Sequence, residues 1–173
     1  MHIFFVHVMN YERILHIMEL DATDIRILSH LQLDARASNA EIAEIALLSA
    51  SQCHRRVKRL EEEGFITGYH AEIDAARVGL DINAFVHVTL GTHEENRVKA
   101  FVEAIEPIED IQECYSITGD ADYILRVSMP NLTSFSEFIM HQLMPLPMVG
   151  NVKSYIAMES VRNSNQLPLT HLP

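Results

Sequence analysis

The stretch SNAEIAEIALLSASQCHRRVKRLEEEGFI, residues 38–66, predicts two short helices with a tight corner between them. Ser38 is followed by Glu41, and Ser49 is followed by Gln52, and both pairs fit a capping box. In that motif the hydroxyl accepts a hydrogen bond from a free backbone N–H, and the longer side chain reaches back to the first residue. The sequence therefore marks where each of the two helices begins.

The second of these helices is predicted to have two chemically different sides. At about 100° per residue, three apolar residues fall together on one side: Cys53, Val57 and Leu60. Within about a quarter-turn on the opposite side lie four polar residues: Gln52, Arg55, Arg56 and Arg59. Guanidinium forks and amides are the groups that pair with phosphates and with guanine or adenine edges in a major groove. We expect one side to be buried and the other to meet DNA.

A third helix is predicted before this pair, from an Asp or Thr cap in the stretch that begins at Asp21 to about Asp34, with an apolar stripe of Ile25, Leu28 and Leu31. Three helices of which the last two form the corner make a helix-turn-helix module.

Within the module, the middle helix is expected to bury Ile42, Ala43 and Ala46. Leu47-Leu48 forms the corner, and Gly64 ends the last helix in a left-handed conformation. Phe65 to Asp74 is predicted as an extended wing or hinge strand.

After residue 81 the hydrophobic period changes, and strands alternate with helices. The predicted elements are a strand at 82–90, a helix with Val98, Phe101, Val102 and Ile105 inside, strands at 111–118 and 123–129, a helix capped by Thr133 or Ser134, and a strand at 151–161. The order βαββαβ is the ferredoxin-like arrangement, in which helices cover one face of an antiparallel sheet. The predicted fold class is therefore α+β.

Four segments follow from this pattern. Residues 1–19 are an extension, with a short strand at 3–8, a helix at 11–17 and Met18 as an alternative start. Residues 20–81 are the DNA-binding domain, with the helix-turn-helix at about 39–58, and residues 82–161 are a second domain. Residues 162–173 are predicted to be a loose tail.

Charge limits how such a chain can bind DNA. The formal net charge is −11, and residues 1–74 alone carry −5. Four of the seven Lys and Arg residues in that half lie between Arg55 and Arg59. Because phosphate attraction is electrostatic, DNA contact must come from this one element, doubled by dimerisation, and must be salt-sensitive.

Other classes of site find little support in the sequence. Cys53 and Cys114 lie apart and lack metal-ligand spacing, so free thiols are expected. The ten histidines show no ligand spacing, and no phosphate-binding glycine loop, GxSxG motif or paired carboxylates predict an enzyme. The N-terminal run MHIFFVHVM has too short an apolar core for a membrane span or signal peptide.

These stretches together resemble the leucine-responsive regulator/AsnC (feast-famine) family of bacterial transcription factors. The resemblance rests on LDATDIRIL, SNAEIAEIALLS, RRVKRLEEEGFITGY, IQECYSITGDADYILRV and PLPMVGNVKSYIAMESV, and it runs from about Leu20 to Asn165. Relatives have a glycine at the corner where this chain has Leu47, and often a basic second helix where this chain has Glu44 and Ile45.

The resemblance implies a DNA-binding domain followed by a domain that oligomerises and senses a small molecule, commonly an amino acid. The expected DNA-binding residues are Ser49, Ser51, Gln52, His54, Arg55, Arg56, Lys58 and Arg59. The expected effector-binding residues are Gly119, Asp120, Asp122, Tyr123, Leu132, Tyr155, Ile156 and Ala157. An amino-acid zwitterion needs a carboxylate for its ammonium group, N–H groups for its carboxylate and an apolar wall. Asp122 is expected to supply the carboxylate.

The sequence thus predicts a cytoplasmic, nucleoid-associated regulator whose partners are double-stranded DNA, an amino-acid effector and further copies of itself, as a dimer, tetramer or octamer. No cofactor, metal or membrane is expected. An alternative stays open: a ligand-binding oligomeric sensor whose DNA binding is weakened or lost. For the hairpin at Gly119–Tyr123, a purely structural turn is the other interpretation.

Overall fold

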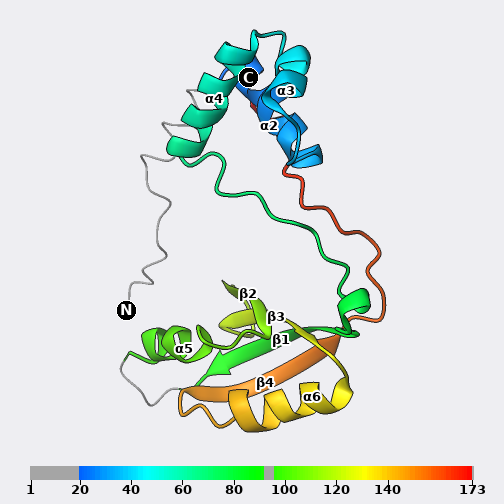
Figure 1. The fold of residues 1–173 in the computed structure, drawn as a ribbon. Helices are drawn as coiled ribbons and strands as arrows, with labels where there is room; N and C mark the ends of the chain where they lie inside the picture. Colours follow the sequence, from blue (N-terminus) through cyan, green and yellow to red (C-terminus); the bar gives the residue numbers. More distant parts are fainter. Residues whose placement is uncertain (1–19, 92–95, 173) are drawn as a thin grey trace. The chain divides into compact units, whose positions relative to one another are not determined.

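The computed structural model describes residues 20–91 and 96–172. The predictions for residues 1–19, including the start at Met18, lie outside these ranges. The chain folds into two compact units (Figure 1). One consists of the described residues up to Ala71 together with those from Asn163 onward, and the other of Glu72–Arg162. Each unit is described by itself below.

The first unit is a bundle of three helices, α2 (Ala22–Leu33), α3 (Asn39–Ala46) and α4 (Ala50–Glu62). The capping boxes predicted at Ser38 and Ser49 are confirmed. For the first helix, where an Asp or a Thr cap was left open, Asp21 caps α2 and also takes part in a complete capping box. The buried apolar core is Leu20, Ile27, Leu31, Ile42, Ala43, Ala46, Cys53, Val57 and Leu60.

One part of the predicted core was placed one residue away from its position in the structure. Ile27 is fully buried in α2, whereas Ile25 and Leu28 only pack against the edge of the core. The buried line of α2 runs through Asp24, Ile27 and Leu31, at i, i+3 and i+7. The hydrophobic pattern did not predict this line, because its first residue, Asp24, carries a charged side chain.

The corner between α3 and α4 lies at Leu47–Leu48, as predicted. Leu47 takes φ 57° and ψ 47°, a left-handed conformation that glycine adopts without strain, and its side chain is 80 % exposed. Gly64, at φ 76°, follows α4, also as predicted. The strand expected over Phe65–Asp74 is not formed in the described chain, because this segment pairs with no neighbouring strand there.

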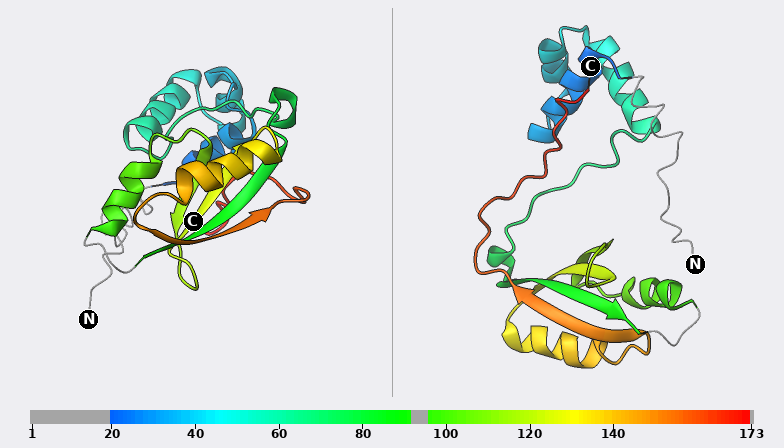
Figure 2. Two further views of the ribbon diagram at one scale, coloured as in Figure 1. Left: turned by 90° about the horizontal axis from the view of Figure 1, so that it is seen from below. Right: turned by 180° about the vertical axis from the view of Figure 1, so that it is seen from behind.

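The second unit is built on a four-stranded antiparallel sheet. Its strands are β1 (Ile82–Leu90), β2 (Ile111–Ser116), β3 (Tyr123–Met129) and β4 (Val149–Ile156), in the spatial order β2-β3-β1-β4. This is the ferredoxin-like order, so the predicted fold class is confirmed. Figure 2 shows β1 and β4 as long neighbouring strands, with α6 along one side of them.

Helices cover one face of this sheet. They are α5 (Arg97–Ile105) and α6 (Leu132–Glu137), the latter continued by η2 (Phe138–Leu143); a short turn, η1 (Ala76–Val78), precedes β1. Even-numbered residues of β1 and odd-numbered residues of β3 point into the core beneath the helices, where Phe101 and Phe138 are fully buried. The alternate residues of β1, such as Phe85 and His87, lie on the other face, which no helix in the described part of this unit covers.

Three predicted details of this unit were wrong. Asn131, and not Thr133 or Ser134, caps α6, because its side chain accepts a hydrogen bond from Ser134 N. In α5, Val98 and Val102 are about half exposed, and only Phe101 and Ile105 enter the core. The last strand, predicted to extend to residue 161, ends at Ile156.

Candidate nucleic-acid interface and ligand pocket

The start of α4 is held by its capping box. Ser49 Oγ accepts a hydrogen bond from Gln52 N at 3.3 Å, and Gln52 Oε1 accepts one from Ser49 N at 3.1 Å. Before it, the N–H of Leu48 donates to Ala43 O at 2.9 Å, so the corner itself satisfies a carbonyl of α3. These bonds fix the angle at which α4 leaves the corner, and they use the Gln52 carbonyl oxygen for capping.

The middle of α4 is bonded to the first turn of α2 by a buried carboxylate. Arg56 Nη1 donates to Asp24 Oδ1 at 2.8 Å, and Arg59 Nη2 donates to Asp24 Oδ2 at 2.7 Å. Asp24 is 1 % exposed. Arg56 Nη1 also lies 2.8 Å from Oδ2 of the capping residue Asp21. Two arginines expected to face DNA therefore hold two helices together.

The charge states in this cluster suit that role. The hydrogen bond to Asp24 raises the pKa of Arg56 above its ordinary value, so this guanidinium stays charged. Partial burial opposes ionisation of Asp21, but the backbone N–H of Asp24 and the Arg56 side chain outweigh it and lower the pKa of Asp21. The cluster is a network of charge-assisted hydrogen bonds at neutral pH.

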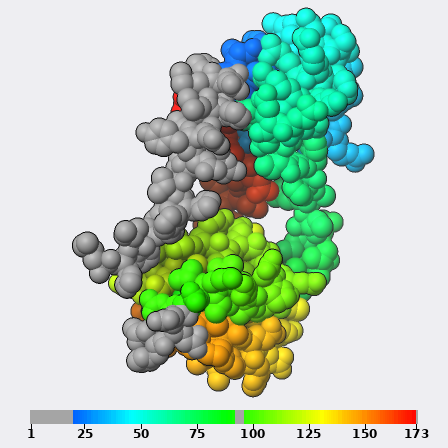
Figure 3. Space-filling model, turned by 90° about the vertical axis from the view of Figure 1, so that its left-hand side faces the viewer, coloured from blue at the N-terminus to red at the C-terminus, as the bar shows by residue number. Residues whose placement is uncertain are grey.

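The exposed side of α4 carries the remaining predicted DNA-binding residues: Ser51, Gln52, His54, Arg55 and Lys58. Lys58 lies 3.5 Å from Glu62 in an exposed i,i+4 pair, which holds the lysine only weakly. His54 Nδ1 lies 3.3 Å from Asn39 Nδ2 of α3. Figure 3 shows α4, in turquoise, at the surface of its unit.

The structure thus divides the predicted basic face into two parts. Arg55 and Lys58 point to solvent, whereas Arg56 and Arg59 lie on the flank toward α2 and are about a third exposed. The sequence contains a pattern that indicates this division. Asp21 and Asp24 are three residues apart at the start of α2, and Arg56 and Arg59 are three residues apart on α4. The two carboxylates could therefore form ion pairs with the two guanidinium groups.

The hairpin at Gly119–Tyr123 joins β2 to β3, with Gly119 at φ 120°. Asp122 Oδ2 accepts a hydrogen bond from Leu90 N at 2.7 Å, and Asp122 N donates to Val88 O at 3.0 Å. Asp122 therefore ties the hairpin to the end of β1. Tyr123 is buried, with its ring centroid 4.8 Å from that of Phe101, so it belongs to the core rather than to a surface pocket.

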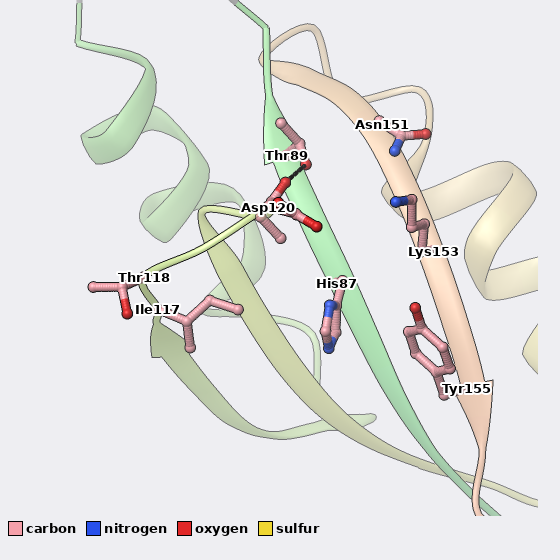
Figure 4. Close-up of a pocket in the computed structure, with 9 residues that line it drawn as sticks. His87, Thr89, Ile117, Thr118, Asp120, Asn151, Lys153 and Tyr155 are labelled. Atoms are coloured by element: carbon pink, nitrogen blue, oxygen red, sulfur yellow. Dashed lines mark hydrogen bonds between the residues drawn. The ribbon is translucent and has the colours of Figure 1, made fainter.

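Beside this hairpin a pocket of about 220 Å³ opens on the uncovered face of the sheet (Figure 4). It is lined by His87, Thr89, Ile117, Thr118, Asp120, Ala121, Asn151, Lys153 and Tyr155. Thr89 Oγ1 donates to Asp120 O at 3.3 Å, and the rings of His87 and Tyr155 are 5.1 Å apart. In Figure 4 the Asp120 carboxylate and the Lys153 ammonium group both point into the space between the hairpin and β4.

Of the predicted effector residues, the pocket brings together Asp120 and Tyr155. Leu132 is the first residue of α6 and Ile156 the last of β4, and both are exposed outside this pocket. Ala157 donates its N–H to Asn83 O at 2.8 Å. His87, Thr89, Asn151 and Lys153 also line the pocket and were not predicted, although their alternation along two neighbouring strands places them on one face of the sheet.

No helix in residues 20–91 and 96–172 is long and apolar enough to cross a membrane. Within the same ranges, no group of three or more His, Cys, Asp or Glu residues is placed to hold a metal ion.

The two units correspond to two known kinds of domain. The family model for the winged helix-turn-helix DNA-binding domain matches residues 20–67, and the family model for the Lrp/AsnC ligand binding domain matches residues 83–167. The protein therefore combines a DNA-binding domain with a ligand-binding domain.

Whole-chain comparisons agree with this assignment. The chain is 36 % identical over 149 residues to the leucine-responsive regulatory proteins of Klebsiella pneumoniae and Escherichia coli strain K12, covering 86 % of this chain and 91 % of theirs. A transcriptional regulator from Neisseria meningitidis in complex with L-Met superposes with a TM-score of 0.85 at 31 % identity, covering 88 % of this chain and 98 % of that one. An AsnC family regulator from Agrobacterium tumefaciens superposes with a TM-score of 0.82 at 30 % identity, covering 88 % of this chain and 99 % of that one.

The chain belongs to the Lrp/AsnC family of transcriptional regulators, as its resemblance predicted.

Proposed function

We propose that this regulator reads DNA with the exposed side of α4 and senses an amino acid in the pocket beside the Gly119–Tyr123 hairpin. The observation that carries the first part is the division of the basic face. Arg55 and Lys58 remain free of Asp24, while Arg56 and Arg59 bind it. Arg55 is the candidate for base edges, and Lys58 and His54 are candidates for phosphates.

The second part of the proposal concerns the effector. The relative from Neisseria meningitidis is described in complex with L-Met. In the present chain, the Asp120 carboxylate suits an ammonium group, the Lys153 ammonium group suits a carboxylate, and Ile117 and Tyr155 offer apolar surface. We assign the ammonium contact to Asp120 in place of Asp122, because Asp122 already accepts the hydrogen bond from Leu90 N.

The proposal includes assembly. The sheet face opposite α5 and α6 carries exposed Phe85, Tyr115 and Tyr155, and a second copy would cover it. A two-fold pair would present two α4 helices to successive major grooves, about 34–36 Å apart. Ligand binding that favours one assembly would alter DNA affinity by coupling. We place this regulator in the cytoplasm, on the nucleoid.

A gel shift with DNA from upstream of the gene that encodes this chain, at two salt concentrations, tests DNA binding. The wild type should bind, with affinity falling at higher salt, and Arg55→Ala should abolish specific retardation. Lys58→Ala should reduce the slope of log affinity against log salt by about one per DNA-binding subunit. Equal binding by wild type and Arg55→Ala would remove the assignment of α4.

A sensor with weakened DNA binding is the second candidate, and one observation favours it. Asp21 and Asp24 form ion pairs with Arg56, and Asp24 also forms one with Arg59. These pairs reduce the positive charge available to DNA within residues 1–74, which already carry a net charge of −5. Amino-acid binding by titration calorimetry, together with no retardation even at low salt, would select this candidate.

A further inference from the structure

The C-terminal segment from Asn163, predicted from the sequence to be a loose tail, is docked on α2. Leu167 N donates a hydrogen bond to Gln32 Oε1 at 2.6 Å, and Gln32 Nε2 donates to Leu167 O at 3.3 Å. A single side-chain amide thus pairs with both backbone groups of one tail residue. Asparagine and glutamine amides offer this complementary donor and acceptor, and a carboxylate or an ammonium group does not.

Apolar contacts extend the docking beyond this pair. Leu172 packs against the core of the three-helix unit, and Leu169 is partly buried. A groove between α2 and the tail is lined by Ile25, Ser29, Gln32, Leu33, Gln166, Leu167, Leu169 and Thr170. In Figures 1 and 2 the red end of the chain lies beside the blue helix α2. The tail therefore belongs to the DNA-binding unit by contact, although it follows the ligand-binding unit in sequence.

The sequence of the tail favours an extended backbone that can bind along α2. Pro168 fixes φ and removes one backbone donor next to Leu167, which disfavours helix formation there. The tail forms no strand or helix in the described residues, and two of its N–H groups find acceptors within it: Leu172 N donates to Leu169 O at 3.1 Å, and Gln166 N donates to Ser164 Oγ at 3.3 Å. Gln32 supplies a partner at the one residue that precedes the proline.

Docking of the tail involves a different part of the unit from the exposed side of α4. The groove residues Ser29 and Leu33 lie on the side of α2 opposite Ile27 and Leu31, which are buried in the core. The exposed side of α4 contributes no residue to the groove.

We propose that this side of α2 is a docking surface for the chain's own C-terminal segment, which ties the DNA-binding unit to the ligand-binding unit a second time. The first connection, residues 67–81, contains the turn η1 (Ala76–Val78), and the second, residues 157–166, could stretch to about 34 Å. While the tail is docked, both connections act at once, which restricts the orientations of the DNA-binding unit more than one connection does. Fewer orientations of the DNA-binding unit mean a smaller entropic cost when two such units bind DNA together.

Hydrogen exchange of the full chain tests the docking directly and does not depend on DNA. The Leu167 amide should be protected in the wild type, and Gln32→Ala should lower its protection about fivefold, the factor for a hydrogen bond of about 1 kcal/mol. Arg26→Ala is the matched control, because Arg26 is an exposed α2 residue whose side chain, among the described residues, bonds to Thr23 of the same helix and to no tail residue. A Leu167 amide that exchanges freely in the wild type, or equally in wild type and Gln32→Ala, would overturn the docking.

A crosslink decides whether the tail docks on its own chain. Gln32→Cys and Leu167→Cys would be combined with Cys114→Ser, since Cys114 is exposed and Cys53 is buried. A short bismaleimide should then give a crosslinked product with the mass of one chain. A product with the mass of two chains would show docking between copies and would overturn the proposal as stated.

The consequence for DNA rests on the proposed function. In a gel shift with the upstream DNA, Gln32→Ala should lose a few-fold in affinity relative to wild type and Arg26→Ala. Unchanged affinity, with Leu167 protection lost, would remove the role of the second connection. A wild type that binds no DNA would refute the proposed function, while the exchange and crosslinking results would still decide the docking.

Discussion

Arg56 Nη1 lies 2.8 Å from Asp24 Oδ1, and this bond joins the middle of α4 to the first turn of α2. Asp24 is 1 % exposed, and the Arg56 side chain is 28 % exposed. A carboxylate so deeply buried is stable as an ion only while its partners remain, because a lost partner leaves an uncompensated charge. The relationship gives Arg56 a structural task that its neighbour Arg55 does not share.

Substitutions of Arg55 and Arg56 should therefore have different effects on stability and on DNA binding. Arg56→Ala should lower the free energy of unfolding by about 2 kcal/mol, because Asp24 loses one of its two arginines. Arg55→Ala should change the free energy of unfolding by less than about 0.5 kcal/mol, as for other exposed positions, and yet abolish specific DNA retardation. Denaturant unfolding and gel shifts on both variants measure this, and equal losses of stability would contradict it.

Leu47 offers a test at the corner. A leucine in the left-handed conformation costs about 1 kcal/mol relative to glycine, and 80 % exposure means that its side chain gains little from burial. Leu47→Gly should raise the free energy of unfolding by roughly that amount. Leu47→Ala serves as the control, because it shortens the side chain but keeps the Cβ that causes the strain. A gain for alanine as large as that for glycine would show that the strain is not at the backbone.

Much of this fold could be predicted because it depends on interactions between residues that are close together in the sequence. Capping residues lie within three positions of the amides that they bond, so Ser38 and Ser49 fixed two helix starts correctly. The period-two pattern likewise predicted the strand at 82–90 that the structure forms as β1. Such features need no knowledge of distant residues.

The features that could not be predicted depend on hydrogen bonds between residues that are far apart in the sequence. Asp24 and Arg56 are 32 positions apart, and Gln32 and Leu167 are 135 apart. A polar residue at a core position looks like a break in the pattern until its partner is known. For the same reason the ligand pocket was only partly anticipated: Asp120 comes from the hairpin, but Lys153 comes from a different strand.

Tyr69 should make the unfolding of the DNA-binding unit sensitive to alkaline pH. Its hydroxyl donates to Glu61 Oε1 of α4 at 2.8 Å, and burial together with this bond raises the pKa of Tyr69 to about 12. The protonated form is favoured in the folded state, so this contribution is complete below the ordinary pKa of about 10 and is lost as pH rises toward 12. Absorbance titration near 295 nm should show that Glu61→Gln moves the titration of one tyrosine from near pH 12 toward pH 10, while Tyr115 and Tyr123, whose pKa values are also raised, titrate alike in both proteins. A Tyr69 that titrates normally in the wild type would contradict the contact.

The carboxylates of the hairpin should also have separable effects. Asp120 lines the pocket, whereas Asp122 accepts the bond from Leu90 N that ties the hairpin to β1. Asp120→Ala should abolish binding of the amino acid that titration calorimetry finds for the wild type among the twenty, with a free energy of unfolding within about 0.5 kcal/mol of the wild-type value. Asp122→Ala should instead lower the free energy of unfolding by about 1–2 kcal/mol, because it removes a charge-assisted hydrogen bond from a partly buried N–H.

Lys153 provides the second half of that test. Lys153→Met keeps an unbranched apolar side chain on β4 and removes the ammonium group that is proposed to meet the ligand carboxylate. It should weaken binding of the amino acid at least tenfold and leave binding of the corresponding amine, which has no carboxylate, unchanged. Asp120→Ala should weaken both ligands, because both retain the ammonium group. If Asp122→Ala abolishes binding without loss of stability while Asp120→Ala has no effect, the ammonium contact belongs to Asp122 and the pocket beside β4 is not the effector site.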